Sequence, residues 1–226
     1  STFTVGLLNS LNCYKGKFVS KDKLAKLACE VEIEKLGNPI GKQDQYGAAL
    51  GGLNFIKFNQ DGSVSHEPIL MEGKTYKELQ KNLLMFYTGT TRSANTILAE
   101  QTRNITSEDK ARNLLKMCEL AKDMKIALEN NDISSFGKIL DEGWQLKKEL
   151  ASGIANQAID EAYEIAMKNG ALGGKLLGAG GGGFLLFYCE EEKQEQLKKA
   201  IGLKELDFSF ERDGTSVIYI GDKYWN

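Results

Sequence analysis

The stretch that decides the fold is residues 175–188, which read Lys-Leu-Leu-Gly-Ala-Gly-Gly-Gly-Gly-Phe-Leu-Leu-Phe-Tyr. Apolar runs on both sides of the glycines predict a strand, a glycine loop and a second strand. Gly178 to Gly183 fits the spacing G-x-G-x-x-G, but in dinucleotide-binding folds that pattern opens a helix. Here an apolar strand follows, which excludes a dinucleotide fold. Four consecutive glycines between strands indicate a backbone that closely approaches a ligand, with a mobile turn as the alternative.

The segments around this loop predict an α+β fold. Upstream, three helical blocks are expected at about 107–129, 132–150 and 156–168, and a buried strand at 83–87. Downstream, a charged amphipathic helix is expected at 190–201. Strands are expected at 207–212 and 217–220, joined by a turn at Asp213-Gly214. Antiparallel hairpins with segregated helices are typical of α+β proteins rather than of alternating βαβ folds.

The first eighty residues predict two helices and a hairpin. One helix should cover about residues 2–12 and end at Gly16. Ser20 is a good N-cap for a second helix to about Leu36, and Gly37 is its expected end. Residues 53–58 alternate as a strand, and Asp61-Gly62 indicates the turn of a hairpin.

Composition excludes several classes of function. The 226 residues carry 29 Lys+Arg against 31 Asp+Glu, so a strongly basic nucleic-acid binder is excluded. No apolar run approaches the roughly 20 residues that span a bilayer, and no basic leader begins the sequence. We therefore expect no nucleic-acid or membrane partner and a cytoplasmic location. The single histidine, His66, nearly excludes a Ser-His-Asp triad, and four widely spaced cysteines indicate free thiols.

Three carboxylates near residue 40 are candidates for chemistry. Glu32 and Glu34 lie on opposite borders of the apolar face of the predicted second helix, and periodicity does not choose between them. Taken alone, the pattern favours the simpler interpretation that Glu30, Glu32 and Glu34 all solvate the helix surface. Asp44 follows in a glycine-rich stretch, where its simplest role is that of an N-cap for a short helix at 45–49.

Three stretches resemble the motifs of the GHMP small-molecule kinases, in the family's order. Residues 1–5 look like those that follow the family's phosphate-binding loop, residues 32–45 resemble a galactokinase-like arrangement ending in Asp-Gln, and residues 175–183 resemble the third motif. Segments 37–45 and 88–94 most resemble the D-glycero-D-manno-heptose 7-phosphate kinases, although other sugar kinases share much of them. The first motif and nearly all of the second are missing, so the sequence resembles the C-terminal two-thirds of such a kinase.

The resemblance implies an ATP- and Mg²⁺-dependent kinase that phosphorylates the anomeric hydroxyl of heptose 7-phosphate for nucleotide-heptose synthesis. It implies a remnant of the ATP-binding domain at 1–80 and a ferredoxin-like C-terminal domain at 81–226. The alternatives are a kinase for galactose, fucose or an N-acetylhexosamine, and a sensor that binds sugar and nucleotide without turnover. We expect the 226-residue chain alone to be inactive, and a homodimer is the assembly to test.

The resemblance also assigns site residues. Asp44 matches the catalytic base, and Glu32, rather than Glu34, matches the magnesium ligand. Four residues match nucleotide-binding positions of the family: Ser1, Thr2, Gly180 and Gly181. The glycine loop and two basic residues match substrate-binding positions: Gly178, Ala179, Gly180, Gly181, Gly182, Lys175 and Arg92. A guanidinium at 92 is suited to a phosphate on the sugar, with an exposed loop arginine as the alternative.

Overall fold

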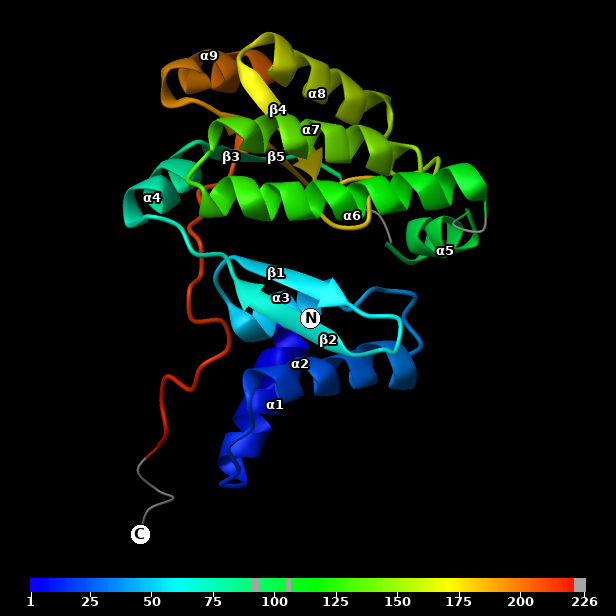
Figure 1. Ribbon diagram of the computed structural model, residues 1–226, viewed down its shortest axis with the longest axis vertical. Helices are drawn as coiled ribbons and strands as arrows, with labels where there is room; N and C mark the ends of the chain where they lie inside the picture. The colour runs from blue at the N-terminus through cyan, green and yellow to red at the C-terminus, as the bar shows by residue number, and fades with distance from the viewer. Residues whose placement is uncertain (91–93, 105–106, 222–226) are drawn as a thin grey trace. The chain divides into compact units, whose positions relative to one another are not determined.

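The computed structural model describes residues 1–90, 94–104 and 107–221 (Figure 1). Its contacts divide the chain into two compact units, one made of residues 1–68 with the segment from Phe210 onward, the other of Ile69–Ser209. The sequence placed the boundary at about residue 80 and assigned the whole C-terminal part to one domain. The assignment of the two units as an ATP-binding domain and a GHMP C-terminal domain stays a prediction.

The first unit contains the two predicted helices and the hairpin. Ser20 Oγ accepts a hydrogen bond from Lys23 N–H at the start of the second helix, and Gly37 ends that helical segment with a φ of +67°. A small core of buried residues holds the helices together, including Val5, Ala25 and Ala49. The elements of this unit are α1 (Thr2–Tyr14), α2 (Lys21–Cys29), η1 (Glu30–Lys35), α3 (Gln43–Leu50), β1 (Asn54–Phe58) and β2 (Val64–Pro68).

The C-terminal segment corrects one prediction. Neither 207–212 nor 217–220 forms a strand in the described part of the chain. The backbone of this segment instead bonds to the end of α3, because Gly52 N–H donates to Glu211 O at 2.7 Å and Thr215 N–H donates to Ala49 O at 3.3 Å. In place of the predicted hairpin turn the backbone bends at Arg212 and Asp213, and Gly214 adopts a φ of +58°.

The second unit has the predicted ferredoxin-like topology. Its antiparallel sheet has the strand order β4-β5-β3-β6, and the chain passes through these strands as β-α-β-β-α-β. Two helices, α4 and α5, were not predicted. The elements are α4 (Gly73–Lys81), β3 (Leu83–Tyr87), α5 (Ala94–Asn104), α6 (Glu108–Glu129), α7 (Ser134–Lys148), α8 (Gln157–Lys168), β4 (Ala171–Leu176), β5 (Phe184–Cys189), α9 (Glu191–Ile201) and β6 (Lys204–Glu205).

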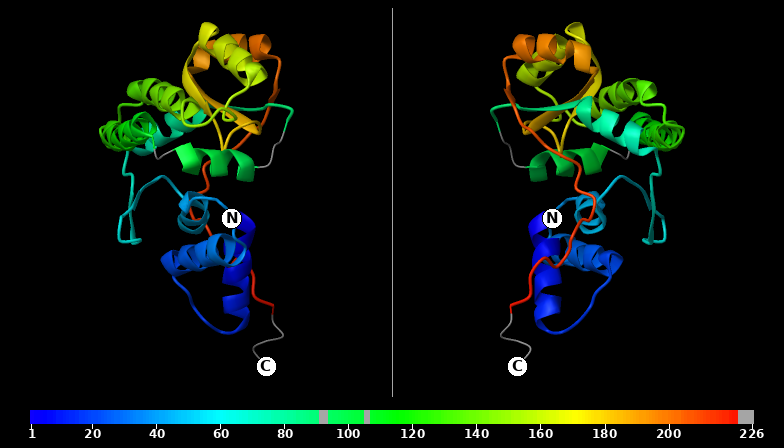
Figure 2. Two further views of the ribbon diagram at one scale, coloured as in Figure 1. Left: turned by 90° about the vertical axis from the view of Figure 1, so that its right-hand side faces the viewer. Right: turned by 90° about the vertical axis from the view of Figure 1, so that its left-hand side faces the viewer.

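The main core lies between this sheet and the helices α8 and α9, which lie side by side above the strands in Figure 2. Phe86 pairs with Leu185 and Leu84 with Phe187, and all four side chains are buried. Helix α7 packs along the edge strand β4. In the described part of the chain, no helix combines the length and apolar composition needed to cross a membrane.

Candidate active site

Glu32 is carried by a π-helix. Helix α2 continues into η1, where Leu36 N–H bonds to Val31 O, five residues back, instead of four. Such an extra residue per turn changes the direction of the side chains that follow, and π-helical turns are frequent at functional sites. Glu32 is only 7% exposed, whereas Glu34 is exposed. The structure thus places Glu32, and not Glu34, in the interior of the first unit.

The Glu32 carboxylate is held by three side chains from two other helices. Thr4 Oγ1 donates to Oε1 at 2.6 Å, Ser1 Oγ donates to Oε2 at 2.8 Å, and Gln45 Nε2 donates to Oε2 at 2.5 Å. The nitrogen of Ser1 also lies 3.2 Å from Oε1. Because Ser1 and Thr4 are the N-cap and first turn of α1, the helix dipole adds to the stabilisation of this negative charge.

These contacts keep Glu32 ionised. Burial raises the pKa of its carboxyl group, but the hydrogen bonds from Thr4, Ser1 and Gln45 have the larger combined effect and lower it from 4.5 to about 2. At neutral pH the first unit therefore holds a fixed, buried negative charge.

The atoms around Glu32 fit a magnesium ion. Gln45 Oε1 is buried and has no hydrogen-bond partner among the described residues, which makes it an oxygen in need of a donor or a cation. With the Glu32 carboxylate and the hydroxyls of Ser1 and Thr4 it forms an all-oxygen set, the donor type that Mg²⁺ prefers. The described residues contain no group of three or more His, Cys, Asp or Glu that could hold a metal. Magnesium commonly uses one or two carboxylates with phosphate oxygens and water, so this set is adequate.

Asp44 is the second residue of α3. The helix begins at Gln43 after Lys42, so the interpretation of Asp44 as the N-cap is wrong. Its side chain is exposed and has no hydrogen bond or ion pair with another described residue, in contrast to the adjacent Gln45, which is buried. A carboxylate that makes no contact with other described residues can approach a substrate hydroxyl without breaking a contact of the fold.

The glycine loop of the second unit joins β4 to β5, as predicted. Five of its residues have positive φ, from +75° at Gly181 to +158° at Gly182, a conformation that side-chain-bearing residues rarely adopt. A Cβ atom added to Gly180 would lie 2.7 Å from Ile154 Cα. Glycine is therefore required here by both the backbone conformation and the close approach of a neighbouring segment.

Hydrogen bonds from neighbouring segments hold the loop at Gly178, Gly181 and Gly183. Gly181 N–H donates to Ile154 O at 3.0 Å, Gly183 N–H donates to Thr90 O at 2.9 Å and to Thr88 Oγ1 at 3.0 Å, and Lys147 Nζ donates to Gly178 O at 2.6 Å. Four N–H groups have no acceptor in the described part of the chain, those of Gly178, Ala179, Gly180 and Gly182. Successive unpaired N–H groups in such a turn are suited to an anion.

Of the two basic residues predicted to bind substrate, the structure describes only Lys175. Arg92 lies outside the described residues. Lys175 lies in β4 opposite Leu186, and burial lowers the pKa of its ammonium group. It has no hydrogen bond or ion pair with another described residue. Thr2, a predicted nucleotide-binding residue, is exposed at the start of α1.

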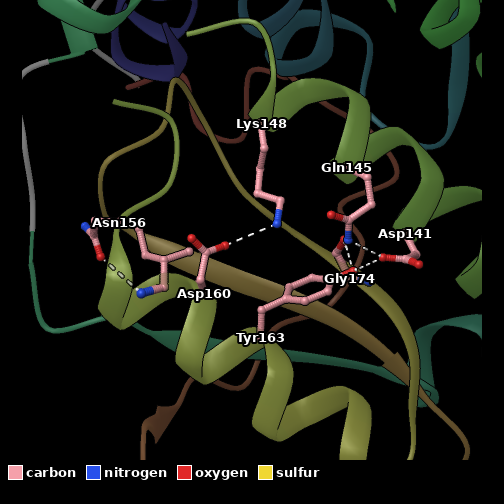
Figure 3. A network of polar contacts seen from close by, with 8 residues as sticks. Asp141, Gln145, Lys148, Asn156, Asp160, Tyr163 and Gly174 are labelled. Carbon is pink, nitrogen blue, oxygen red and sulfur yellow. Dashed lines mark hydrogen bonds and ion pairs between the residues drawn. The ribbon is translucent and has the colours of Figure 1, made fainter. Parts of the chain in front are cut away.

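Sequence reasoning missed a polar network that joins α7, α8 and β4 (Figure 3). Tyr163 OH donates to Asp141 Oδ1 at 2.7 Å and accepts a hydrogen bond from Gly174 N–H at 3.1 Å. Burial, with the bond to Asp141, raises the pKa of Tyr163, so its hydroxyl stays protonated. The network occupies the outward N–H of the edge strand and borders a cavity of about 540 Å³.

Comparison with known proteins gives matches along nearly the whole chain. The family model described as GHMP kinases C terminal matches residues 124–205. The chain is 32% identical to the D-glycero-alpha-D-manno-heptose 7-phosphate kinase of Campylobacter jejuni over 217 residues, which are 95% of this chain and 64% of that enzyme. It is 30% identical to a bifunctional fucokinase/GDP-fucose pyrophosphorylase of Arabidopsis thaliana over 71% of this chain and 16% of that protein.

The crystal structure of a D-glycero-D-manno-heptose 1-phosphate kinase from Bacteroides thetaiotaomicron is similar in fold as well as in sequence. The identity is 29%, the TM-score is 0.68, and the match covers 94% of this chain and 60% of that one. The chain thus spans less than two-thirds of the length of these relatives. The topology of the second unit agrees with the family match, so residues 124–205 form a GHMP kinase C-terminal domain, and the chain is similar to sugar kinases over 95% of its length.

Proposed function

We propose that the protein is an ATP- and Mg²⁺-dependent sugar kinase that phosphorylates the anomeric hydroxyl of D-glycero-D-manno-heptose 7-phosphate. The observation that carries the kinase chemistry is the buried, ionised Glu32 with its oxygen-rich surroundings. Similarity to the Campylobacter jejuni enzyme over 95% of the chain supports the choice of substrate. The reaction would take place in the cytoplasm, where free thiols such as those of this chain persist.

Phosphoryl transfer requires positioning and charge stabilisation more than covalent chemistry by the protein. Asp44 would accept the proton of the sugar hydroxyl. The unpaired N–H groups of the glycine loop would bind phosphate oxygens, and Arg92 and Lys175 would recognise the phosphate already on the sugar. Magnesium, when bound, would neutralise phosphate charge, and Glu32, Gln45, Ser1 and Thr4 are the residues that would hold it.

Two other functions have some support. A kinase for galactose, fucose or an N-acetylhexosamine would use the same machinery, and the similarity to the Arabidopsis thaliana protein favours fucose among these. A sensor that binds sugar and nucleotide without turnover would not need a base. The presence of both Glu32 and an exposed, unpartnered Asp44 favours an enzyme over a sensor.

The test is an ADP-release assay on the complete gene product with ATP, Mg²⁺ and a panel of sugars. The panel is heptose 7-phosphate, heptose 1-phosphate, galactose, fucose and N-acetylglucosamine. We expect turnover of heptose 7-phosphate, with a new anomeric phosphate in the ³¹P NMR spectrum of the product. Efficient turnover of an unphosphorylated sugar alone would overturn the substrate, and binding without turnover of any sugar would support a sensor.

A further inference from the structure

Helix α7 and strand β4 run side by side in the same direction. A Cβ atom added to Gly173 would lie only 1.8 Å from Gly137 O, so the two backbones are in direct contact at this point. From Gly137 to Lys147 the helix advances about 15 Å, and from Gly173 to Gly178 the extended chain advances about 16 Å. The C-terminal end of α7 therefore lies level with the first residue of the glycine loop.

Contacts with α8 and β4 fix the position of helix α7. Tyr163 of α8 bonds to Asp141 of α7 and to Gly174 of β4 (Figure 3). Trp144 is buried one helical turn before Lys148, with its ring 6.1 Å from that of Tyr163. A side chain at the end of this helix thus starts from a fixed position relative to the sheet.

From that position Lys147 bonds to the glycine loop, its Nζ donating to Gly178 O at 2.6 Å. In a trans peptide the carbonyl oxygen and the following N–H point in opposite directions, and the described chain has no cis peptide. The bond to Lys147 therefore turns the N–H of Ala179 away from the lysine. That N–H has no acceptor among the described residues, so it is available to a ligand.

No other hydrogen bond between described residues fixes this peptide. Gly178 has a φ of +79°, no atom within 4 Å of where its Cβ would be, and an exposed position. Glycine adopts positive and negative φ with similar ease, so without the lysine the peptide could rotate and present its carbonyl oxygen in place of the Ala179 N–H. A carbonyl oxygen repels a phosphate oxygen, whereas an N–H group binds it.

We propose that Lys147 is a positioning residue that holds the Gly178–Ala179 peptide in the orientation that binds a phosphate group of a substrate. The proposal rests on the proposed kinase function for the identity of that substrate. The phosphate belongs either to ATP or to the sugar phosphate. The substrate whose KM rises when Lys147 is replaced is the one whose phosphate this peptide binds.

The kinetic test compares Lys147→Met and Lys147→Arg with Lys148→Met in the complete gene product. Lys148 is a matched control, because it is the next residue and pairs with Asp160 instead of the loop. We expect Lys147→Met to raise KM for one phosphate-bearing substrate by about 10- to 100-fold, the loss of one charge-assisted hydrogen bond. The other KM and kcat should change far less, Lys147→Arg should recover part of the loss, and Lys148→Met should behave as wild type.

A binding test needs no turnover. The ¹⁵N amide signal of Ala179 is followed while inorganic pyrophosphate is added, and we expect a saturable shift in wild type whose Kd rises at least about tenfold in Lys147→Met. If this holds in a protein that lacks kinase activity, the inference survives and the proposed function fails. Equal Kd and equal KM values for wild type and Lys147→Met, or no shift of Ala179 in wild type, would overturn the inference. A loss of thermal stability with both KM values raised would indicate a merely structural lysine and would overturn it as well.

Discussion

Gln45 donates a hydrogen bond from Nε2 to Glu32 Oε2 at 2.5 Å, while its own Oε1 is buried and has no hydrogen-bond partner in the described part of the chain. An unsatisfied buried acceptor costs about 1–3 kcal/mol. The amide cannot simply turn over to relieve this, because its oxygen would then face the Glu32 carboxylate. A cation in contact with Gln45 Oε1 would satisfy this oxygen, and this is the structural observation that favours magnesium here.

Replacing Glu32 should therefore change the magnesium requirement. In Glu32→Gln we expect the Mg²⁺ concentration for half-maximal activity to rise by about tenfold or more, since a ligating charge is lost. The measurement is kinase activity as a function of free Mg²⁺ at saturating substrates. Glu34→Gln is the matched control, because this exposed glutamate lies two residues further on. A defect in Glu34→Gln with a silent Glu32→Gln would show that the wrong glutamate has been assigned.

Acid should destabilise the protein partly through Glu32. Its pKa falls from 4.5 in the unfolded chain to about 2 in the folded protein, so the unfolded state binds the proton first. The associated stability, about 3 kcal/mol, is complete above pH 4.5 and is lost as the pH falls from 4.5 to 2. Urea unfolding at pH 6 and pH 3 should show a smaller loss for Glu32→Gln than for wild type and Glu34→Gln. Equal losses in all three proteins would contradict the assigned pKa.

The choice of Glu32 over Glu34 shows which parts of the candidate site could be predicted from the sequence. An ideal α-helix places both glutamates on the borders of the apolar face, and the family motif, not the periodicity, selected Glu32. Glu32 is buried within the π-helical segment Glu30–Lys35, and no pattern in the sequence predicted that this segment would be π-helical. Thr4 and Lys147 were missed because their partners lie 28 and 31 residues away, and helical periodicity gives no information on such contacts.

The fold was predictable where short-range signals dominate. The strands on both sides of the glycine loop and the cap at Ser20 depend on neighbouring residues, and they are confirmed. Helix α4 was missed because it is short and carries only two large apolar side chains, Tyr76 and Leu79, too few to establish a helical period from the sequence. The strand predicted at 217–220 has the β-branched and aromatic composition of a strand, yet no described segment pairs with it. Strand formation depends on a partner, which composition does not reveal.

Asp44→Asn should impair catalysis without unfolding the protein. The Asp44 side chain is exposed and makes no hydrogen bond or ion pair with other described residues, so its replacement removes no contact within the fold. If Asp44 is the general base, kcat should fall by about 10²–10⁴-fold, with a much smaller change in nucleotide affinity. The control is Asp61→Asn in the β1–β2 turn, which should retain wild-type kcat. A wild-type kcat for Asp44→Asn would remove Asp44 from the mechanism.

A methyl group at Gly180 should disrupt the glycine loop more than one at Gly178. Both residues have positive φ, which costs an alanine about 1–3 kcal/mol. Only at Gly180 would the new Cβ also meet a neighbour, 2.7 Å from Ile154 Cα. We expect a lower Tm and a larger loss of kcat/KM in Gly180→Ala than in Gly178→Ala. The reverse order would mean that Ile154 does not support the loop.

The identity of the sugar should be decided at Arg92, which lies outside the described residues but stands in a segment rich in hydroxyl groups, Thr88 to Ala94. A bidentate contact between a guanidinium and a phosphate is worth about 1.5–3 kcal/mol. Arg92→Ala should therefore raise KM for heptose 7-phosphate by roughly 10- to 150-fold and leave KM for ATP nearly unchanged. Arg92→Lys should recover only part of this, because an ammonium group cannot reproduce the planar fork. Kinases for galactose or fucose act on sugars without a phosphate, so their turnover would not depend on this residue. Efficient phosphorylation of free fucose or galactose that is unaffected by Arg92→Ala would exclude the heptose phosphate while leaving the protein a kinase.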